Sequence, residues 1–555
     1  MRQICILLVV LLSFLTICNA EETYVFEDTS APLTESQLQA ATQARIAIIG
    51  AGMSGINVGR NLIEYGIEDF VVFEAQNRIG GRMYSKPLGS DGINVDGGAM
   101  WIQGLGKQNG PINPIWDFVR KSDIECHLVN WNKEAIYDVD GTPASLDYNK
   151  LDSMDACVVN EIQSAIQRGE LRDISSLEAM RLCGFEPETA LERAGRMYYH
   201  DFEWSETPAV TSTNYTANFP TYDYYGDTDC LLTDNRGYGE VVLQLMDQYY
   251  QGGRTDERVI LNAPVFNINT ADRVIELKTG EKLQFDYIIN SMPIGVVQYE
   301  MRGTGRKNND PPLYTPEWSL QRRSALEAYH MVTYHKTFLR FEEVFWDAKE
   351  IIIKAPLFPE MSMVITPMDI GSNTKLRPGT GIICVQHFSD VAIWMDEMSD
   401  ADILELIMTE LRLMYGKNIP DPTYVSTSLE NDNPYQRYSY SNVPVGFSED
   451  EFALLFEPEN NHYFTGEARC RNLNGYVHGA YLAGQTTALE VLRDMQANGI
   501  SELQNLTLPD PYNNACWRDP RTIVPDVEKR ALYGRKQRKE AARQEFLQYN
   551  SDPTY

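Results

Sequence analysis

The sequence predicts an α/β fold, and three neighbouring features near its N-terminal end support this prediction. A short apolar run, Ile46–Ile49, leads directly into the glycine-rich turn Gly50–Gly55, and a helical pattern follows through Leu62. A second apolar run, Phe70–Phe73, ends at the acidic residue Glu74. The order strand, glycine turn, helix, strand and acid is typical of a Rossmann-like unit that binds a dinucleotide.

The turn residues have separate physical roles in such a unit. Gly50 allows the tight turn after the strand, Gly52 lets the backbone approach a pyrophosphate, and Gly55 lets the helix pack closely on the strand. The helix that follows, with Ser54 in its first turn, offers unpaired N–H groups to phosphates. Glu74 stands where a carboxylate accepts hydrogen bonds from a ribose 2′-OH, which favours FAD or NAD over NADP. The alternative is a glycine-rich turn with a purely structural role.

Two further stretches favour FAD over NAD. The segment Arg78–Arg82 places a glycine pair between arginines directly after Glu74. Far along the chain, a strand-like stretch ends at Gly466 and Glu467, and a helix of small residues, Gly479–Gly484, follows. A second point of close backbone approach, with its own helix N-terminus, suits the pyrophosphate and ribityl end of a longer cofactor.

The rest of the chain alternates strand-like and helical stretches. Strand-like runs lie at 259–261, 287–289, 351–353 and 381–385, and a helical pattern lies at Asp402–Met414. The composition shifts after about Ser501, and the tail carries the basic run Arg535–Lys539. We interpret this tail as a solvated amphipathic helix on an acidic body, in preference to a nucleic-acid or membrane patch.

Length and charge narrow the functional classes. The 555 residues suffice for two or three domains, or for one large two-domain enzyme. The formal net charge of -30 argues against nucleic-acid binding and favours attraction of cationic ligands.

The N-terminus predicts secretion. A basic start is followed by an apolar run from Ile4 to Cys18 and by Asn19 and Ala20. This pattern is typical of a signal peptide cleaved near Ala20, and the run is too short for a comfortable membrane anchor, which is the alternative. No other stretch predicts a membrane span. Two glycosylation sequons, at Asn214 and Asn505, are compatible with an extracellular location.

Cysteines are scattered. Two of the nine, Cys5 and Cys18, belong to the signal peptide, and the remaining seven include no CxxC pair. The spacing argues against a zinc site, and the odd number leaves at least one thiol unpaired. We expect one or two disulfides, which the sequence does not assign.

On these residues and on further blocks, the chain resembles the flavin-containing amine oxidases, most closely the plant-type secreted polyamine oxidases. The blocks are Val95–Trp101, Tyr334–Leu339 and Tyr463–Gly484, together with the glycine turn, Glu74 and Arg78–Arg82. The resemblance covers roughly residues 45–493 and leaves the basic tail outside. The block around Lys336 and the stretch Asn474–Tyr481 are its most specific parts.

The resemblance implies a glutathione-reductase-like FAD-binding domain assembled from separated segments, with an inserted α+β substrate-binding domain. The expected boundaries are signal peptide 1–20, N-terminal arm 21–43, FAD-binding segments 44–110, 226–300 and 446–500, substrate-binding segments 111–225 and 301–445, and basic tail 501–555.

It also implies roles for single residues. Lys336 resembles the lysine that holds a water near flavin N5 and assists the reaction with oxygen. Tyr334 and Tyr476 resemble tyrosines of the substrate tunnel, and Tyr440 resembles the aromatic residue that sandwiches the substrate with Tyr476. Glu203 resembles a tunnel carboxylate that binds an ammonium group; the alternative for it is a residue without a functional role. Trp101 and Gln103 would also contact the substrate. The implied cofactor-binding residues are Gly50, Gly52, Ser54, Gly55, Glu74, Arg82, Gly98, Ala99, Met100, Val265, Gly466, Glu467, Tyr476 and Val477.

Three positions depart from the family pattern. Gln103 stands where the polyamine oxidases have a second tunnel carboxylate, which weakens the binding expected for a polycation. The stretch Glu430–Tyr435 lacks the tryptophan expected before Tyr440, and Ala468 replaces the usual histidine.

The first functional hypothesis is a secreted polyamine oxidase. It would oxidise spermine or spermidine, small cationic amines, to an imine that hydrolyses to an aldehyde and an amine, while O2 becomes H2O2. The second is a flavin oxidase of another amine or of an L-amino acid, which an arginine in the pocket would favour. The third is a secreted binding protein that keeps the fold without the activity. The sequence indicates no oligomeric state.

Overall fold

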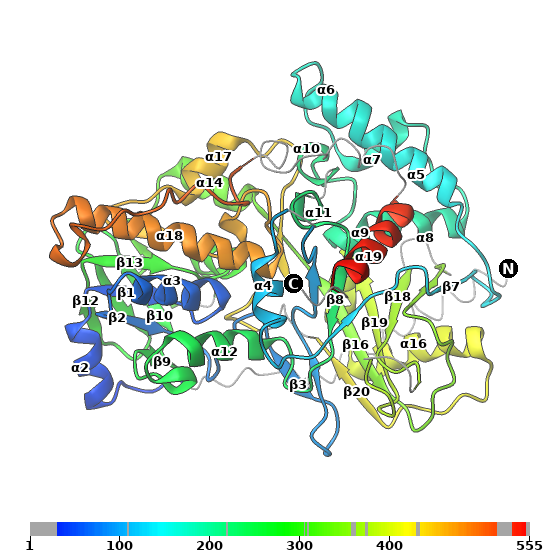
Figure 1. Ribbon diagram of the computed structural model, residues 1–555, viewed down its shortest axis with the longest axis horizontal. Coiled ribbons are helices and arrows are strands. Elements are labelled where there is room, and N and C mark those ends of the chain that lie inside the picture. Colours follow the sequence, from blue (N-terminus) through cyan, green and yellow to red (C-terminus); the bar gives the residue numbers. More distant parts are fainter. Residues whose placement is uncertain are drawn as a thin grey trace.

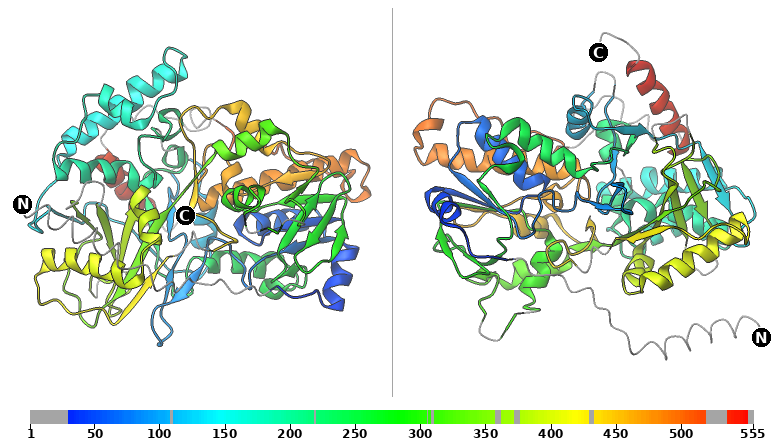
Figure 2. Two further views of the ribbon diagram at one scale, coloured as in Figure 1. Left: turned by 180° about the vertical axis from the view of Figure 1, so that it is seen from behind. Right: turned by 90° about the horizontal axis from the view of Figure 1, so that it is seen from below.

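The computed structural model describes residues 30–107, 110–217, 220–304, 306–307, 310–356, 362–371, 376–428, 433–518 and 535–550. Figure 1 shows two layered bodies side by side, one around the N-terminal strands and one around a second sheet that carries α16. Figure 2 shows the same division from behind and from below.

The first body is built on a parallel sheet. Its five strands run in the order β22-β13-β1-β2-β9, and every neighbouring pair is parallel. The bounds are β1 Ile46–Ile49, β2 Phe70–Phe73, β9 Val259–Ile260, β13 Tyr287–Asn290 and β22 His462–Phe464. All residues of β1 and β2 are buried, as expected for central strands of a parallel sheet. The α/β prediction is confirmed, and the sheet collects strands from distant parts of the chain.

Helices cover this sheet, and a smaller sheet lies against it. The long helix α18, Val477–Ala497, packs on α3, Met53–Glu64, and α12 spans Gly239–Tyr249. The small sheet has the order β12-β11-β10-β14. Its strands are β10 Val265–Asn269, β11 Val274–Leu277, β12 Lys282–Gln284 and β14 Tyr314–Thr315. Three more helices are α13 Ile294–Met301, α14 Leu320–Ala328 and α17 Glu449–Phe456.

Part of the segment expected to form an N-terminal arm, residues 21–43, is a helix. Helix α2 spans Glu35–Gln43 and begins with a capping box between Thr34 and Gln37. Its Ala41 is fully buried in the core that also holds Val71 and Phe73. The cap satisfies the first N–H groups and the buried alanine attaches the helix to the sheet, so the arm prediction is wrong from Glu35 onward.

The second body is built on a mixed six-stranded sheet with the order β20-β16-β19-β18-β17-β7. Only β17 and β7 pair in parallel. Side chains alternate between its faces, since Phe338 joins the core under α5 and α8 while Leu339 joins the core under α16. The bounds are β7 Glu134–Tyr137, β16 Tyr334–Arg340, β17 Ile351–Lys354, β18 Met363–Pro367, β19 Ile382–Phe388, β20 Tyr424–Thr427, α5 Tyr148–Cys157, α8 Ala190–Tyr199, α15 Ser389–Asp396 and α16 Asp400–Tyr415.

Short elements lie between the two bodies and around them. The strands are β3 Ser85–Pro87 with β4 Asn94–Asp96, β5 Trp101–Gln103 with β8 Asp229–Leu232 and β6 Cys126–Leu128, and β15 His330–Val332 with β21 Tyr440–Asn442. The helices are α4 Pro114–Val119, the π-helix η1 Val158–Gln163, α6 Ser164–Gln167, α7 Ser176–Leu182, α9 Asp201–Trp204, α10 Thr213–Thr216, α11 Pro220–Tyr225, η2 Gly253–Thr255, η3 Glu467–Arg469, η4 Ser501–Leu503 and α19 Arg535–Asn550.

The basic tail contains the predicted helix. Helix α19, red in Figure 1, lies beside β8 near the middle of the molecule. Two of its side chains, Lys539 and Phe546, are buried. The helix therefore packs on the body as expected, although it is less solvated than expected.

Three disulfides connect the described residues: Cys126–Cys230, Cys157–Cys183 and Cys470–Cys516. The remaining described cysteine, Cys384, is a buried free thiol. The expectation of one or two disulfides is therefore wrong, while the expected unpaired thiol is present. The pairs join positions separated by up to 104 residues, so only the folded chain brings them together.

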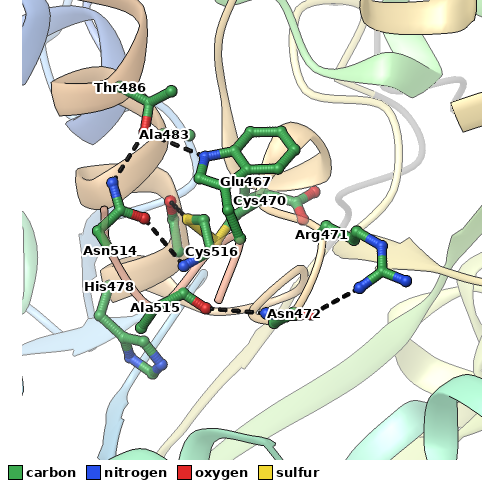
Figure 3. Close-up of a disulfide and its surroundings, with 12 residues drawn as sticks. Glu467, Cys470, Arg471, Asn472, His478, Ala483, Thr486, Asn514, Ala515 and Cys516 are labelled. Atoms are coloured by element: carbon green, nitrogen blue, oxygen red, sulfur yellow. Dashed lines mark hydrogen bonds between the residues drawn. A yellow bond between two sulfur atoms is a disulfide. The ribbon is translucent and has the colours of Figure 1, made fainter. Parts of the chain in front are cut away.

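Figure 3 shows the third disulfide, which attaches the segment around Cys516 to the turn after η3. Asn472 donates to the carbonyl of Ala515 at 3.2 Å, and Asn514 donates to Thr486 of α18 at 2.9 Å. This connection fixes the turn that carries Glu467 against α18.

Some predictions lie outside what the structure describes or tests. The expected signal peptide, residues 1–20, lies outside the described residues. Of the two sequons, Asn505 is exposed and Asn214 is partly buried. The expected domain boundaries stay predictions. Within the described residues, no helix has the length and apolar character needed to cross a membrane, and no cluster of side chains suits a metal ion.

Candidate active site

One cavity of about 280 Å³ lies where the two bodies meet. The glycine turn lines it from the parallel sheet, and Lys336 lines it from the mixed sheet. All the site residues expected from the sequence line this cavity, with Gly55 as the exception.

Gly55 acts through packing. A Cβ atom added there would lie 2.0 Å from the carbonyl oxygen of Gly50, which no real contact allows. The residue therefore permits the close approach of α3 to the end of β1, which is the role expected for the third glycine of the turn.

Glu74, at the end of β2, faces the cavity and holds the turn in place. Its Oε2 accepts the N–H of Ala51 at 2.8 Å, and its Oε1 accepts the N–H of Gln76 at 2.9 Å. Burial raises the pKa of this carboxyl above its usual value, although both N–H groups act in the opposite direction. Each oxygen accepts one of these hydrogen bonds and has a second lone pair to offer a ribose hydroxyl.

The segment after β22 approaches the same cavity. Gly466 has a φ of +117°, which favours glycine, and a Cβ atom there would point into open space. Glu467 pairs with Arg82 at 2.9 Å and accepts the N–H of Gly475 at 2.8 Å. An open glycine backbone, an oriented guanidinium group and the N-terminus of α18 form a cradle for a pyrophosphate. The donor set fits FAD.

Lys336 lies on β16 with its side chain directed into the protein and only 4% exposed. Its Nζ donates to the carbonyl oxygen of Asp96 at 3.1 Å and to that of Gly98. Gly98, Ala99 and Met100 line the cavity at this point. Two backbone carbonyls thus fix a buried ammonium group beside the segment 98–100.

Tyrosines surround Glu203 of α9. Tyr476 donates its hydroxyl to Glu203 Oε1 at 2.5 Å, and Tyr440 donates its hydroxyl to the backbone carbonyl of Glu203 at 2.8 Å. The ring of Tyr334 lies 6.4 Å from that of Tyr440. Burial, followed by the Glu203 charge, raises the pKa of Tyr476 well above its usual value, so its hydroxyl stays a donor. The result is an aromatic chamber with one carboxylate in its wall.

Trp101 and Gln103 of β5 continue this chamber. The indole of Trp101 stacks on that of Trp131, with ring centroids 5.7 Å apart. Gln103 lines the cavity with a neutral side chain, where the resemblance implies a carboxylate.

Sequence reasoning missed a second carboxylate, Asp229. It is 1% exposed, lines the cavity and accepts the indole N–H of Trp131 at 2.9 Å. No local pattern marks it, because it enters the site only through the pairing of β8 with β5 and β6. Other missed cavity residues include Trp131, Phe202, Trp204, Tyr222 and Tyr435.

Tyr435 bears on the missing tryptophan before Tyr440. It belongs to the stretch that lacks this tryptophan, and it lines the cavity. This stretch therefore contributes an aromatic side chain to the cavity lining, although it lacks the tryptophan.

Comparison with known proteins agrees with this geometry. The family model described as "Flavin containing amine oxidoreductase" matches residues 53–492. Polyamine oxidase 1 of Zea mays is 31% identical over 476 residues, which cover 81% of this chain and 91% of that protein. Polyamine oxidase 6 of Oryza sativa subsp. japonica is 30% identical, with coverage of 82% and 92%.

Solved structures show the same fold. Cyclohexylamine oxidase from Brevibacterium oxydans IH-35A matches with a TM-score of 0.63 at 16% identity and covers 82% of this chain and 100% of that one. A double mutant of putrescine oxidase matches with a TM-score of 0.60 at 15% identity, with coverage of 81% and 98%. The chain is therefore an FAD-dependent oxidoreductase acting on CH–NH groups, and it belongs to the flavin-containing amine oxidoreductase family.

Proposed function

We propose that the protein is a secreted polyamine oxidase that acts on spermine or spermidine. The observation that carries this proposal is the position of Glu203, whose carboxylate is hydrogen-bonded to Tyr476 inside an aromatic chamber that also contains Lys336. The chamber offers a flat apolar lining and a fixed negative charge, which suits an alkyl chain with more than one ammonium group.

Different residues of the cavity bind different parts of the substrate. The rings of Tyr334, Tyr440 and Tyr476 exclude water around one amine and favour loss of its proton, because burial disfavours the charged form. Glu203 and Asp229 hold the remaining ammonium groups by charge-assisted hydrogen bonds. Asp229 is a second carboxylate in a cavity in which position 103 is neutral.

The oxidation removes a hydride equivalent from the carbon next to the neutral nitrogen and a proton from that nitrogen. The residues around Gly52, Glu74 and Gly466 would hold FAD, which would supply the two-electron redox chemistry, with O2 as the final acceptor and H2O2 as the product. The substrate leaves as an imine that water hydrolyses to an aldehyde and an amine. Lys336 presents a fixed ammonium group to the cavity, where it can bind a water molecule and move a proton.

The two alternatives from the sequence have less support. An L-amino acid substrate needs a guanidinium partner for its carboxylate, and Arg82, the arginine that lines the described cavity, already pairs with Glu467 and donates to the Ser439 carbonyl. A binding protein without activity does not explain why Lys336 and the FAD cradle are both intact.

Secretion is part of the proposal. The N-terminal pattern of a basic start, an apolar run and Ala20 supports it. The three disulfides support it too, because disulfides persist in oxidising compartments.

The test is a substrate panel with purified protein in which H2O2 release is measured. We expect turnover with spermidine or spermine and none with amino acids that carry a free α-carboxylate. Turnover with amino acids or simple monoamines alone would contradict the polyamine proposal and leave the family assignment intact.

A further inference from the structure

Helix α19 places a lysine against residues that line the substrate cavity. The helix lies outside residues 53–492, which the family model matches. Its Lys539 is only 7% exposed, and its Nζ lies 2.9 Å from Oδ2 of Asp229. Because lysine is seldom buried without a partner, this pair is a specific contact.

The surroundings of the Lys539 ammonium group form a cation site. Its Nζ lies 3.8 Å from the ring centroid of Trp131 and 5.1 Å from that of Tyr222. Aromatic faces and a carboxylate are the groups that bind a primary alkylammonium ion. Trp131, Tyr222 and Asp229 all line the cavity that contains Glu203 and Lys336. A lysine of the chain itself therefore occupies a position suited to one end of a polyamine.

Other side chains of α19 also hold the helix in this position, among them Arg538, whose guanidinium lies 3.7 Å from the carboxylate of Asp155. Phe546, two helical turns after Lys539, lies on the same side of the helix and packs against Trp116, with centroids 5.7 Å apart. Glu540 accepts a hydrogen bond from Asn132 at 2.7 Å. A 16-residue helix that is mostly polar is marginal in water by itself, so its position depends on such contacts.

We propose that α19 is a built-in competitor of the substrate: Lys539 occupies the cation site of Trp131, Tyr222 and Asp229, and α19 moves aside when a terminal ammonium group of a diamine or polyamine takes that site. This proposal rests on the proposed function only for the identity of the substrate. The cation site and its occupant come from the contacts of Lys539.

The apparent affinity for the substrate depends on the fraction of molecules in which α19 is docked. A ligand that needs the undocked state binds with an apparent affinity reduced by the fraction of molecules in which α19 is undocked. If α19 is docked about 90% of the time, its release lowers the KM for a polyamine about tenfold. The kcat should stay the same, because Asp229, Trp131 and Tyr222, which Lys539 contacts, are not among the tyrosines that surround the reacting amine.

The first experiment compares full-length variants. Lys539→Gln removes the competing charge, and Arg543→Gln, one turn further along α19, is the matched control because the contacts with Asp229, Trp131 and Tyr222 belong to Lys539. Phe546→Ala weakens the packing of α19 on the body and keeps Lys539. It is the alternative test variant if Lys539→Gln fails to fold. We expect Lys539→Gln and Phe546→Ala to lower the KM for spermidine about tenfold at constant kcat, with no change in the control. An unchanged or higher KM in both test variants would overturn the proposal.

The second experiment needs no turnover and so separates this proposal from the proposed function. Hydrogen–deuterium exchange of the peptide 535–550 is followed in the flavin-loaded protein without O2. We expect slow exchange in the free protein, and faster exchange in Lys539→Gln and on addition of spermidine. If spermidine binds, as measured by calorimetry, and α19 stays equally protected, Lys539 does not compete and the proposal is wrong.

Discussion

Replacing Glu203 by glutamine removes one charge from the aromatic chamber and keeps the shape of the side chain. The amide oxygen can still accept the Tyr476 hydroxyl, which now lies 2.5 Å from the carboxylate, so the tyrosine wall should stay in place. The loss is therefore confined to the attraction between the carboxylate and a substrate ammonium group.

The size of this loss follows from the two kinds of hydrogen bond. A bond to a charged group contributes about 1.5–3 kcal/mol and a neutral one about 0.5–1.5 kcal/mol, so the difference is about 1–1.5 kcal/mol. This corresponds to a decrease of roughly 5- to 15-fold in kcat/KM for spermidine. A monoamine of similar length, used as a competitive inhibitor, has no second ammonium group for Glu203, and its inhibition constant should not change.

The matched control is Glu206→Gln. Glu206 lies three positions further on, is bonded to His330 and Asn442, and does not line the cavity. Peroxide release gives kcat/KM for both variants. An equal loss in the two variants, or an equal loss for spermidine and the monoamine, would refute the assignment of Glu203 as an ammonium-binding residue.

Three further predictions test other parts of the account. Lys336→Met should lower turnover by about 100-fold or more, the lower range for loss of a proton-transfer group, with FAD absorbance retained; Lys86→Met, a lysine outside the cavity, should have little effect on the rate. Glu74→Gln should weaken FAD binding by about tenfold, since an amide cannot accept from both the Ala51 and Gln76 N–H groups, and the FAD retained after gel filtration measures this; unchanged retention would show that Glu74 is dispensable. Burial lowers the pKa of His462 to about 3, so protonation favours the unfolded chain and stability is lost as pH falls below the ordinary value near 6.5. His462→Phe should therefore gain about 2 kcal/mol relative to the wild type between pH 7 and pH 5 in denaturant titrations, and a difference independent of pH would contradict this reasoning.

The elements around the glycine turn could be predicted from the sequence because the residues that determine them are close together along the chain. The strands at Ile46–Ile49 and Phe70–Phe73 have the bounds that the apolar runs predict. The small space at Gly55 and the open backbone at Gly466 explain why glycine is needed there. The spacing of Thr34 and Gln37, which form the capping box of α2, is likewise a local signal.

Other residues around the cavity could not be predicted from local sequence patterns. Asp229 and Trp131 belong to stretches without a distinctive pattern, and they meet through strand pairing and a shared hydrogen bond. Lys539 reaches Asp229 from a helix 310 residues further along the chain. The three disulfide pairs have the same origin, because proximity after folding, and not spacing along the chain, decides them.

The central claim is that bound FAD in this chamber oxidises a polyamine. The most direct measurement follows the visible absorbance of FAD in the purified protein as spermidine is added without O2. We predict that the absorbance is lost on adding spermidine and returns, with release of H2O2, when O2 is admitted. A flavin spectrum that spermidine and spermine leave unchanged would contradict the claim.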